Sequence, residues 1–140
     1  MPPENAKTAP LTFTKQERLC SETQIAELLR NRQRIFCPPL KCHYIFLPIT
    51  EDNTVNQLVI SVPKRFLKHA VDRNRVKRLV REAYRLHHRE ILDPALQAQG
   101  VRAQLLITYS SKEISTYNII EDKIIEILQR LTKANQSEGL

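Results

Sequence analysis

The chain has 140 residues, of which 41% are hydrophobic and 26% are charged, and its formal net charge is +7. This length and balance are typical of one globular domain with its own core, and they exclude wholesale disorder. No apolar run reaches the roughly 18 residues of a membrane-spanning helix, and two glycines are too few for a glycine-rich phosphate loop.

The first half of the chain predicts a tail, a helix and two strands. Three prolines in residues 1–10 indicate a flexible tail, after which the domain is expected to span 11–133. Ser21 and Gln24 have capping-box spacing and are followed by apolar residues at helical intervals, which predicts a helix over 21–31.

Two strands follow the Pro38-Pro39 pair. Residues 40–47 are rich in β-branched and aromatic side chains, and a second run of this kind, 57–62, ends at Pro63. A polar turn at 51–53 separates the runs, so we expect them to pair as a hairpin.

The second half predicts a long helix, a buried strand and a last helix. Residues 70–90 lack Gly and Pro, 93–100 form a loop, and the apolar run in 103–109 is typical of a strand inside a sheet. Ser115 or Thr116 caps the last helix, and residues 134–140 form a polar tail. The predicted elements follow the order helix, strand, strand, helix, strand, helix, with room for one more short strand. This order predicts a single α+β domain with helices packed on one sheet.

The cysteines give no sign of a disulfide framework or a metal site. Cys20, Cys37 and Cys42 are odd in number and irregularly spaced, and residues 1–10 lack the pattern of a secretory signal. We expect free thiols, a cytoplasmic protein and no bound metal, because structural zinc needs closely spaced ligand pairs.

The positive charge is concentrated in one segment. Residues 64–89 hold ten basic and two acidic side chains, for a net charge of +8, whereas the rest holds 12 basic and 13 acidic ones, a net of −1. Such a concentration indicates a polyanionic partner. The alternative is an ordinary solvated helix face.

The predicted helix over 70–90 contains most of this charge, and we call it the basic helix. A helical wheel divides it into two faces. The predicted core face consists of Val76, Leu79, Val80, Ala83, Leu86 and His87. The opposite face consists of Asn74, Lys77, Arg78, Arg81, Arg85 and Arg89. Like charges at i,i+4 on this face repel each other until an anion binds, and arginine grips phosphate bidentately. A strand before this segment, instead of a partner helix, favours RNA over DNA.

Residues 70–84 resemble the RNRxKRxxRE signature of the bacterial ribonuclease P protein component. The strand and Lys64-Arg65 pair before it, and the lead-in Phe13–Leu19, are similar to the same family, and the resemblance covers about residues 11–131. It implies a small α-β sandwich of ribosomal-protein type, with about four strands, helices packed on them and a left-handed βαβ crossover.

The resemblance also implies partners and chemistry. Proteins of this family bind a catalytic RNA and the 5′ leader of precursor tRNA, and the RNA removes the leader with magnesium. We therefore expect RNA partners, no DNA or membrane partner, no catalytic residue and no magnesium bound by the protein alone.

The expected sites follow from the matching motif positions. The residues expected to bind the RNA subunit are Lys64, Arg65, Arg73, Asn74, Arg75, Lys77, Arg78 and Arg81. Phe13, Tyr44 and Phe46 are the candidates for lining the leader cleft between the first helix and the sheet, with core packing as the alternative for the latter two. Ile25 and Leu29 stand where the family often has aromatic residues.

Two other functions fit parts of the sequence. A ribosome-type structural RNA-binding protein would share the basic helix but play no part in cleavage. A protein nuclease acting alone would need clustered acids to hold magnesium, and the basic segment contains only Asp72 and Glu82. His87 and His88 are expected to be structural.

Overall fold

The structure is a computed structural model that describes residues 22–30, 33–51 and 55–138, except for the side chains of 135–138. The elements in chain order are α1 (Glu22–Arg30), β2 (Arg34–Cys37), β3 (Leu40–Pro48), β4 (Gln57–Ser61), α2 (Ala70–Ile91), α3 (Asp93–Ala98), β5 (Val101–Tyr109) and α4 (Tyr117–Glu138). The α+β class and single sheet agree with the sequence prediction. The predicted tail 1–10 lies outside the described residues.

The sheet has the strand order β2-β3-β5-β4. β3 pairs antiparallel with β2 and β5, and β4 pairs parallel with β5. The predicted hairpin between 40–47 and 57–62 is therefore wrong, because β5 lies between these strands. Its run Leu105–Ile107 is buried on both faces of the sheet, which requires an interior position.

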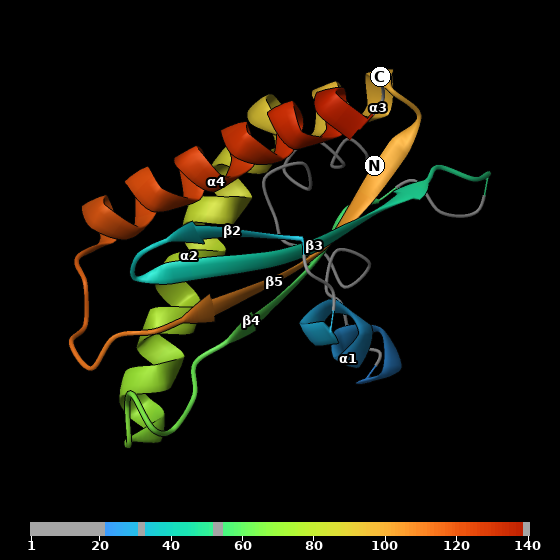
Figure 1. Ribbon diagram of the computed structural model, residues 1–140. Helices are drawn as coiled ribbons and strands as arrows, with labels where there is room; N and C mark the ends of the chain where they lie inside the picture. Colours follow the sequence, from blue (N-terminus) through green and yellow to red (C-terminus); the bar gives the residue numbers. More distant parts are fainter. Residues whose placement is uncertain (1–21, 31–32, 52–54, 139–140) are drawn as a thin grey trace, which may run out of the picture.

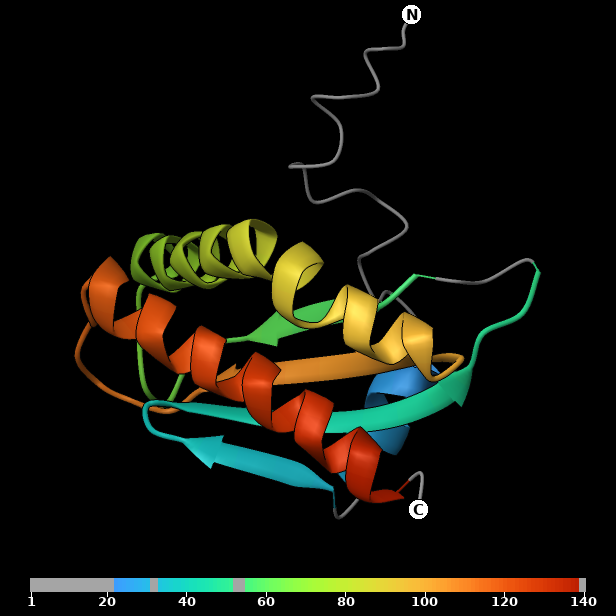
Figure 2. The same ribbon diagram turned by 90° about the horizontal axis from the view of Figure 1, so that it is seen from above.

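Helices cover both faces of the sheet. Figures 1 and 2 show α2, α3 and α4 on one face and α1 on the other. Leu40, Cys42 and Tyr44 of β3 belong to the main core on the side of α2 and α4. Ile45, the next residue along, packs instead with Leu28 of α1, as alternation along a strand requires.

The core face of α2 is rotated from the predicted one. Three predicted core residues are buried, namely Val76, Val80 and Ala83. Leu79 and His87 are half-buried, but the prediction for Leu86 is wrong because this side chain is 37% exposed. Tyr84 and His88 are buried instead, with their rings stacked at a centroid distance of 4.5 Å.

Two helical segments differ from the sequence prediction. The short helix α3 occupies the predicted loop, because Pro94 lies in its first turn, where a missing N–H costs no hydrogen bond. Gly100 follows with a φ of 74°, a conformation that favours glycine. α4 continues to Glu138, within the segment 134–140 for which a tail was predicted, since no Gly or Pro interrupts it before Gly139.

Candidate nucleic-acid interface

The exposed side of α2 carries most of the side chains expected to bind RNA. Asn74, Arg75, Arg78 and Arg81 are exposed, and Lys77 lies half-buried at the flank. Within the described part of the chain, none of these five side chains makes a hydrogen bond or an ion pair. Their donors are therefore open to a polyanion, and we call this set the α2 ridge.

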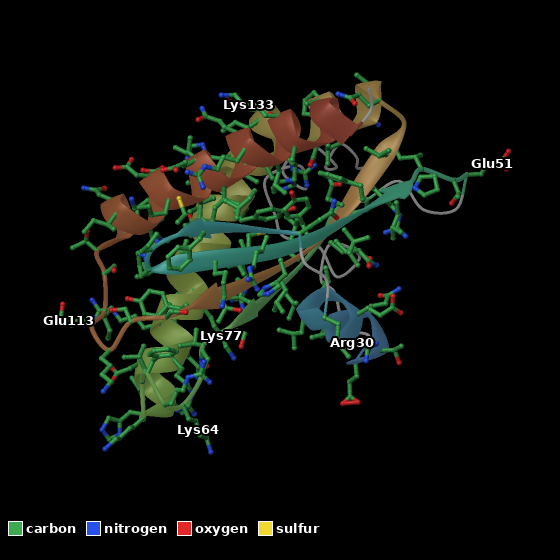
Figure 3. All side chains as sticks on the ribbon, viewed as in Figure 1. Arg30, Glu51, Lys64, Lys77, Glu113 and Lys133 are labelled. Atoms are coloured by element: carbon green, nitrogen blue, oxygen red, sulfur yellow. The ribbon has the colours of Figure 1, made fainter. Side chains whose placement is uncertain are left out.

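The turn before α2 adds Lys64 and Arg65, both of which are exposed. The carbonyl of Pro63 accepts the N–H groups of Phe66 and Leu67 at 3.1 and 3.3 Å, which fixes the turn. The Arg65 guanidinium lies 4.8 Å from the centre of the Phe66 ring. In Figure 3 the labelled Lys64 and Lys77 both lie toward the N-terminal part of α2.

Arg73 links this turn to the helix. Its Nη1 donates to the carbonyls of Leu67 and Lys68 at 3.0 and 2.7 Å, so part of its guanidinium positions the backbone. His69, the N-cap of α2, makes no side-chain capping bond. The first-turn N–H groups and the positive end of the helix dipole are therefore open to a phosphate beside the basic turn.

The basic face of α2 does not include Arg85 as a free cation. Its guanidinium donates to Glu82 from Nη2 at 2.5 Å and from Nε at 3.2 Å, and this contact lowers the pKa of Glu82. Further along, His87 Nε2 lies 2.8 Å from Glu121 Oε2 on α4, and the hydroxyl of Tyr117 donates to the same oxygen at 3.4 Å. These contacts join α2 to α4 along one flank.

The C-terminal end of α2 is anchored by polar contacts of two buried side chains, His88 and Asn56. His88 Nδ1 lies 2.9 Å from one carboxylate oxygen of Asp93, and Asn56 donates to the other at 2.7 Å. The Asn56 amide oxygen accepts the N–H of Ala103 at 2.7 Å. The network joins α2, α3, the start of β4 and β5, and it agrees with a structural role for His88.

The position predicted for Tyr44 and Phe46, in a cleft beside the first helix, is wrong. Tyr44 is 7% exposed within the main core, and Phe46 packs against that core with its ring 5.3 Å from Tyr44. Side chains at even positions of β3 face α2 and α4, so the α1 side is formed by odd positions such as Lys41 and Ile45. Phe13, the third candidate, lies outside the described residues.

Sequence reasoning missed a group of side chains on the α1 side of β2 and β3. Arg34 pairs across the strands with His43, and Phe36 pairs with Lys41. His43 is buried, and its burial, together with the charges of Lys41 and Arg34, lowers its pKa. The available signal was that residues 33–50 contain no Asp or Glu.

The described residues form neither a cluster of metal ligands nor a membrane-spanning helix. Across residues 22–30, 33–51 and 55–138, no group of three or more His, Cys, Asp or Glu side chains could hold a metal ion. None of the helices in these ranges is both long enough and apolar enough to cross a membrane. Cys37 and Cys42 are buried free thiols, and Cys20 lies outside the described residues.

Comparison with known sequences gives one family. The family described as Ribonuclease P matches residues 13–132. The ribonuclease P protein component of Porphyromonas gingivalis is 32% identical over 135 residues, which cover 95% of this chain and 97% of that protein. The corresponding protein of Chlorobium phaeobacteroides is 26% identical over 123 residues, covering 75% and 84% of the two chains.

Comparison with solved structures gives the same fold. The RNase P protein of Staphylococcus aureus aligns with a TM-score of 0.63 at 16% identity, covering 82% of this chain and 94% of that one. The RNase P protein of Thermotoga maritima aligns with a TM-score of 0.62 at 19% identity, covering 81% and 96%. The expected α+β fold of the ribonuclease P proteins is thereby confirmed.

Proposed function

The chain belongs to the ribonuclease P protein family, and from this membership we propose that it is the protein subunit of the tRNA-processing ribonucleoprotein ribonuclease P. In that role it binds the catalytic RNA and the 5′ leader of precursor tRNA. It assists magnesium-dependent removal of the leader, which leaves the mature 5′ end, and the RNA subunit carries the chemistry. The location that we propose is the cytoplasm.

The observation that carries this proposal is the α2 ridge. Three exposed arginines and a lysine without acidic partners among the described residues point away from the core, and the open N-terminus of α2 lies beside them. These like charges repel each other in the free protein, and phosphates that neutralise them remove this repulsion. We assign the RNA subunit to this ridge, the turn residues Lys64 and Arg65, and Arg73.

We assign the leader to the α1 side of the sheet. The other side is filled by the main core, so a nucleic acid has no access there. On the α1 side, Leu28 packs on Leu106, and Ile25, Ile45 and Val59 are only partly buried around them. Partly buried apolar side chains next to basic ones suit bases and phosphates, respectively.

The protein's own residues do not fit a magnesium site. Magnesium prefers oxygen ligands, and the acids on α2 are Asp72, Glu82 and Glu90, the last one residue before the C-terminus of the helix. Glu82 is held by Arg85, and Asp72 lies among cations. We therefore assign the magnesium ions to the RNA subunit and to no group of the protein.

A reconstitution tests the proposal. The purified chain, the ribonuclease P RNA of the same organism and labelled precursor tRNA are mixed at low magnesium, with each component also omitted in turn. We expect rapid leader release only when RNA and protein are both present. RNA that binds the protein but cleaves no faster than RNA alone would favour a ribosome-type structural protein, and cleavage by the protein alone would favour a protein nuclease.

A further inference from the structure

The arginines of α2 differ between the two halves of the helix. In the N-terminal half, Arg75, Arg78 and Arg81 are exposed, and no described residue accepts a hydrogen bond from their side chains. In the C-terminal half, Arg85 and Arg89 are half-buried, and each interacts with other residues of the chain. The open cations of the helix therefore end at Arg81, although basic residues continue for about two more turns.

Glu82 lies where this change occurs. Arg85 follows Arg81 by one helical turn and so lies on the same side of α2, but its guanidinium reaches back to Glu82. Nη2 lies 2.5 Å from Oε2 of the carboxylate, and Nε lies 3.2 Å from Oε1. Such a two-bond contact between an arginine and a carboxylate is geometrically specific as well as strong. The donors that would extend the α2 ridge by one turn are thereby occupied.

Helix α4 borders this ion pair on one flank. Burial and the charges of Glu121 and Glu82 raise the pKa of Tyr117, whereas the charge of Arg85 acts in the opposite direction. The Tyr117 hydroxyl donates to Glu121, which also contacts His87 of α2. The flank where α2 meets α4 is thereby supplied with carboxylates, and it does not attract phosphates as the ridge does.

An open arginine at position 85 would favour RNA that has no fixed position on the protein. Non-specific binding to nucleic acids consists almost entirely of contacts between cations and phosphates, and it allows the protein to slide. A sliding protein can bring any open cation onto a phosphate, so it would gain one contact with every duplex. A folded RNA that is recognised by its shape keeps one position, and it gains nothing if its phosphates lie along the ridge alone.

We propose that Glu82 is a specificity determinant, because by holding Arg85 it ends the RNA-binding face of α2 at Arg81 and denies an extra phosphate contact to RNA other than the RNA subunit. This inference rests on the proposed function. Affinity for non-cognate duplexes is lowered while the contacts of the RNA subunit stay unchanged, so the ratio of the two affinities rises. The alternative is an ordinary ion pair that only stabilises the helix.

The test measures how salt affects binding of the full chain to two labelled RNAs, the RNA subunit and a random-sequence RNA duplex. Glu82→Gln is compared with Glu90→Gln, a matched control that removes an exposed acid near the C-terminus of α2 and changes the net charge equally. A double variant, Glu82→Gln with Arg85→Gln, shows whether any gain depends on the guanidinium. Thermal unfolding establishes that each variant is folded.

For the random duplex, we expect Glu82→Gln to have a slope of log affinity against log salt that is steeper than the control's by about 0.9, the contribution of one phosphate. Between about 50 and 200 mM salt, this variant should therefore lose about 3.5-fold more affinity for the duplex than the control. The double variant should return to the slope of the unmodified chain. For the RNA subunit, Glu82→Gln and the control should have equal slopes.

Three results would overturn the role of Glu82. One is a slope for the RNA subunit that becomes steeper as well, since Glu82 would then compete with the cognate RNA. Another is equal slopes for Glu82→Gln and the control on both RNAs, which would leave only the ion-pair role. The third does not depend on the folding of Glu82→Gln: Arg85→Gln should have the slopes of Lys133→Gln, which removes one exposed charge from α4, and a shallower slope on either RNA would contradict the proposal. An unmodified chain that binds both RNAs equally well would instead refute the proposed function.

Discussion

Replacing both Arg75 and Arg78 with Ala tests the α2 ridge as the contact for the RNA subunit. Both side chains are exposed and make no bond within the described residues. The free energy of unfolding should therefore change by no more than about 0.5 kcal/mol. Any loss of RNA affinity then reports on binding and not on folding.

The size of the effect follows from counterion release. Each phosphate neutralised on duplex-like RNA contributes about −0.9 to the slope of log affinity against log salt. Losing the contacts of Arg75 and Arg78 should make the slope less steep by about 1.8. Between about 50 and 200 mM salt, the unmodified chain should consequently lose about 12-fold more affinity than the double variant.

The assay is a titration of labelled RNA subunit with protein at several salt concentrations. The control variant removes two charges elsewhere, at Lys112 and Lys133, which are exposed on the loop before α4 and on α4 itself. Its slope should match that of the unmodified chain. An unchanged slope for the ridge variant, or an equal drop for the control, would refute the assignment.

Three further predictions concern single contacts. Glu82→Gln removes the carboxylate charge that contacts Arg85 and adds one net positive charge to the basic helix, so the RNA subunit should bind more tightly in the same titration; unchanged or weaker binding would contradict this. Asn56→Ala leaves the buried N–H of Ala103 without its acceptor, and urea unfolding should show a loss of about 1–3 kcal/mol; a loss below about 0.5 kcal/mol would mean that another group replaces the amide. The pKa of His43 is lowered from 6.5, so on acidification the unfolded chain takes up this proton before the folded one. Stability should fall as the pH drops through about 6.5, and His43→Asn should remove this part of the decrease in thermal unfolding; identical pH profiles would rule it out.

The strongest local patterns were sufficient to predict the main elements. The basic helix needed only its length without Gly or Pro and its alternating faces, and it is observed over Ala70–Ile91. The apolar run of β5 likewise predicted an interior strand. The α2 ridge could be predicted because its residues all lie within the single segment 74–81 and their exposure follows from helical spacing alone.

Features that depend on distant partners were not predictable. Alternation along β3 separates Tyr44 from Ile45, but both faces of the sheet are covered by helices. Which face lies against α1 is decided only by the pairing with β5 and the positions of the helices. Similarly, His88 is buried in place of Leu86 because Asp93 and the Tyr84 ring accommodate the imidazole. These partners of the imidazole are brought to it by tertiary contacts, which the local sequence pattern does not show.

The insertion of β5 between β3 and β4 also determines when the domain can form during synthesis. β4 pairs only with β5 among the described strands, and β5 follows α2 in the chain. While the ribosome is still making residues 62–100, β4 has no partner strand and the basic helix has no complete sheet to pack on. Folding of the sheet must wait for Tyr109, so a nascent chain stopped before β5 holds the whole RNA-binding motif without the fold that presents it.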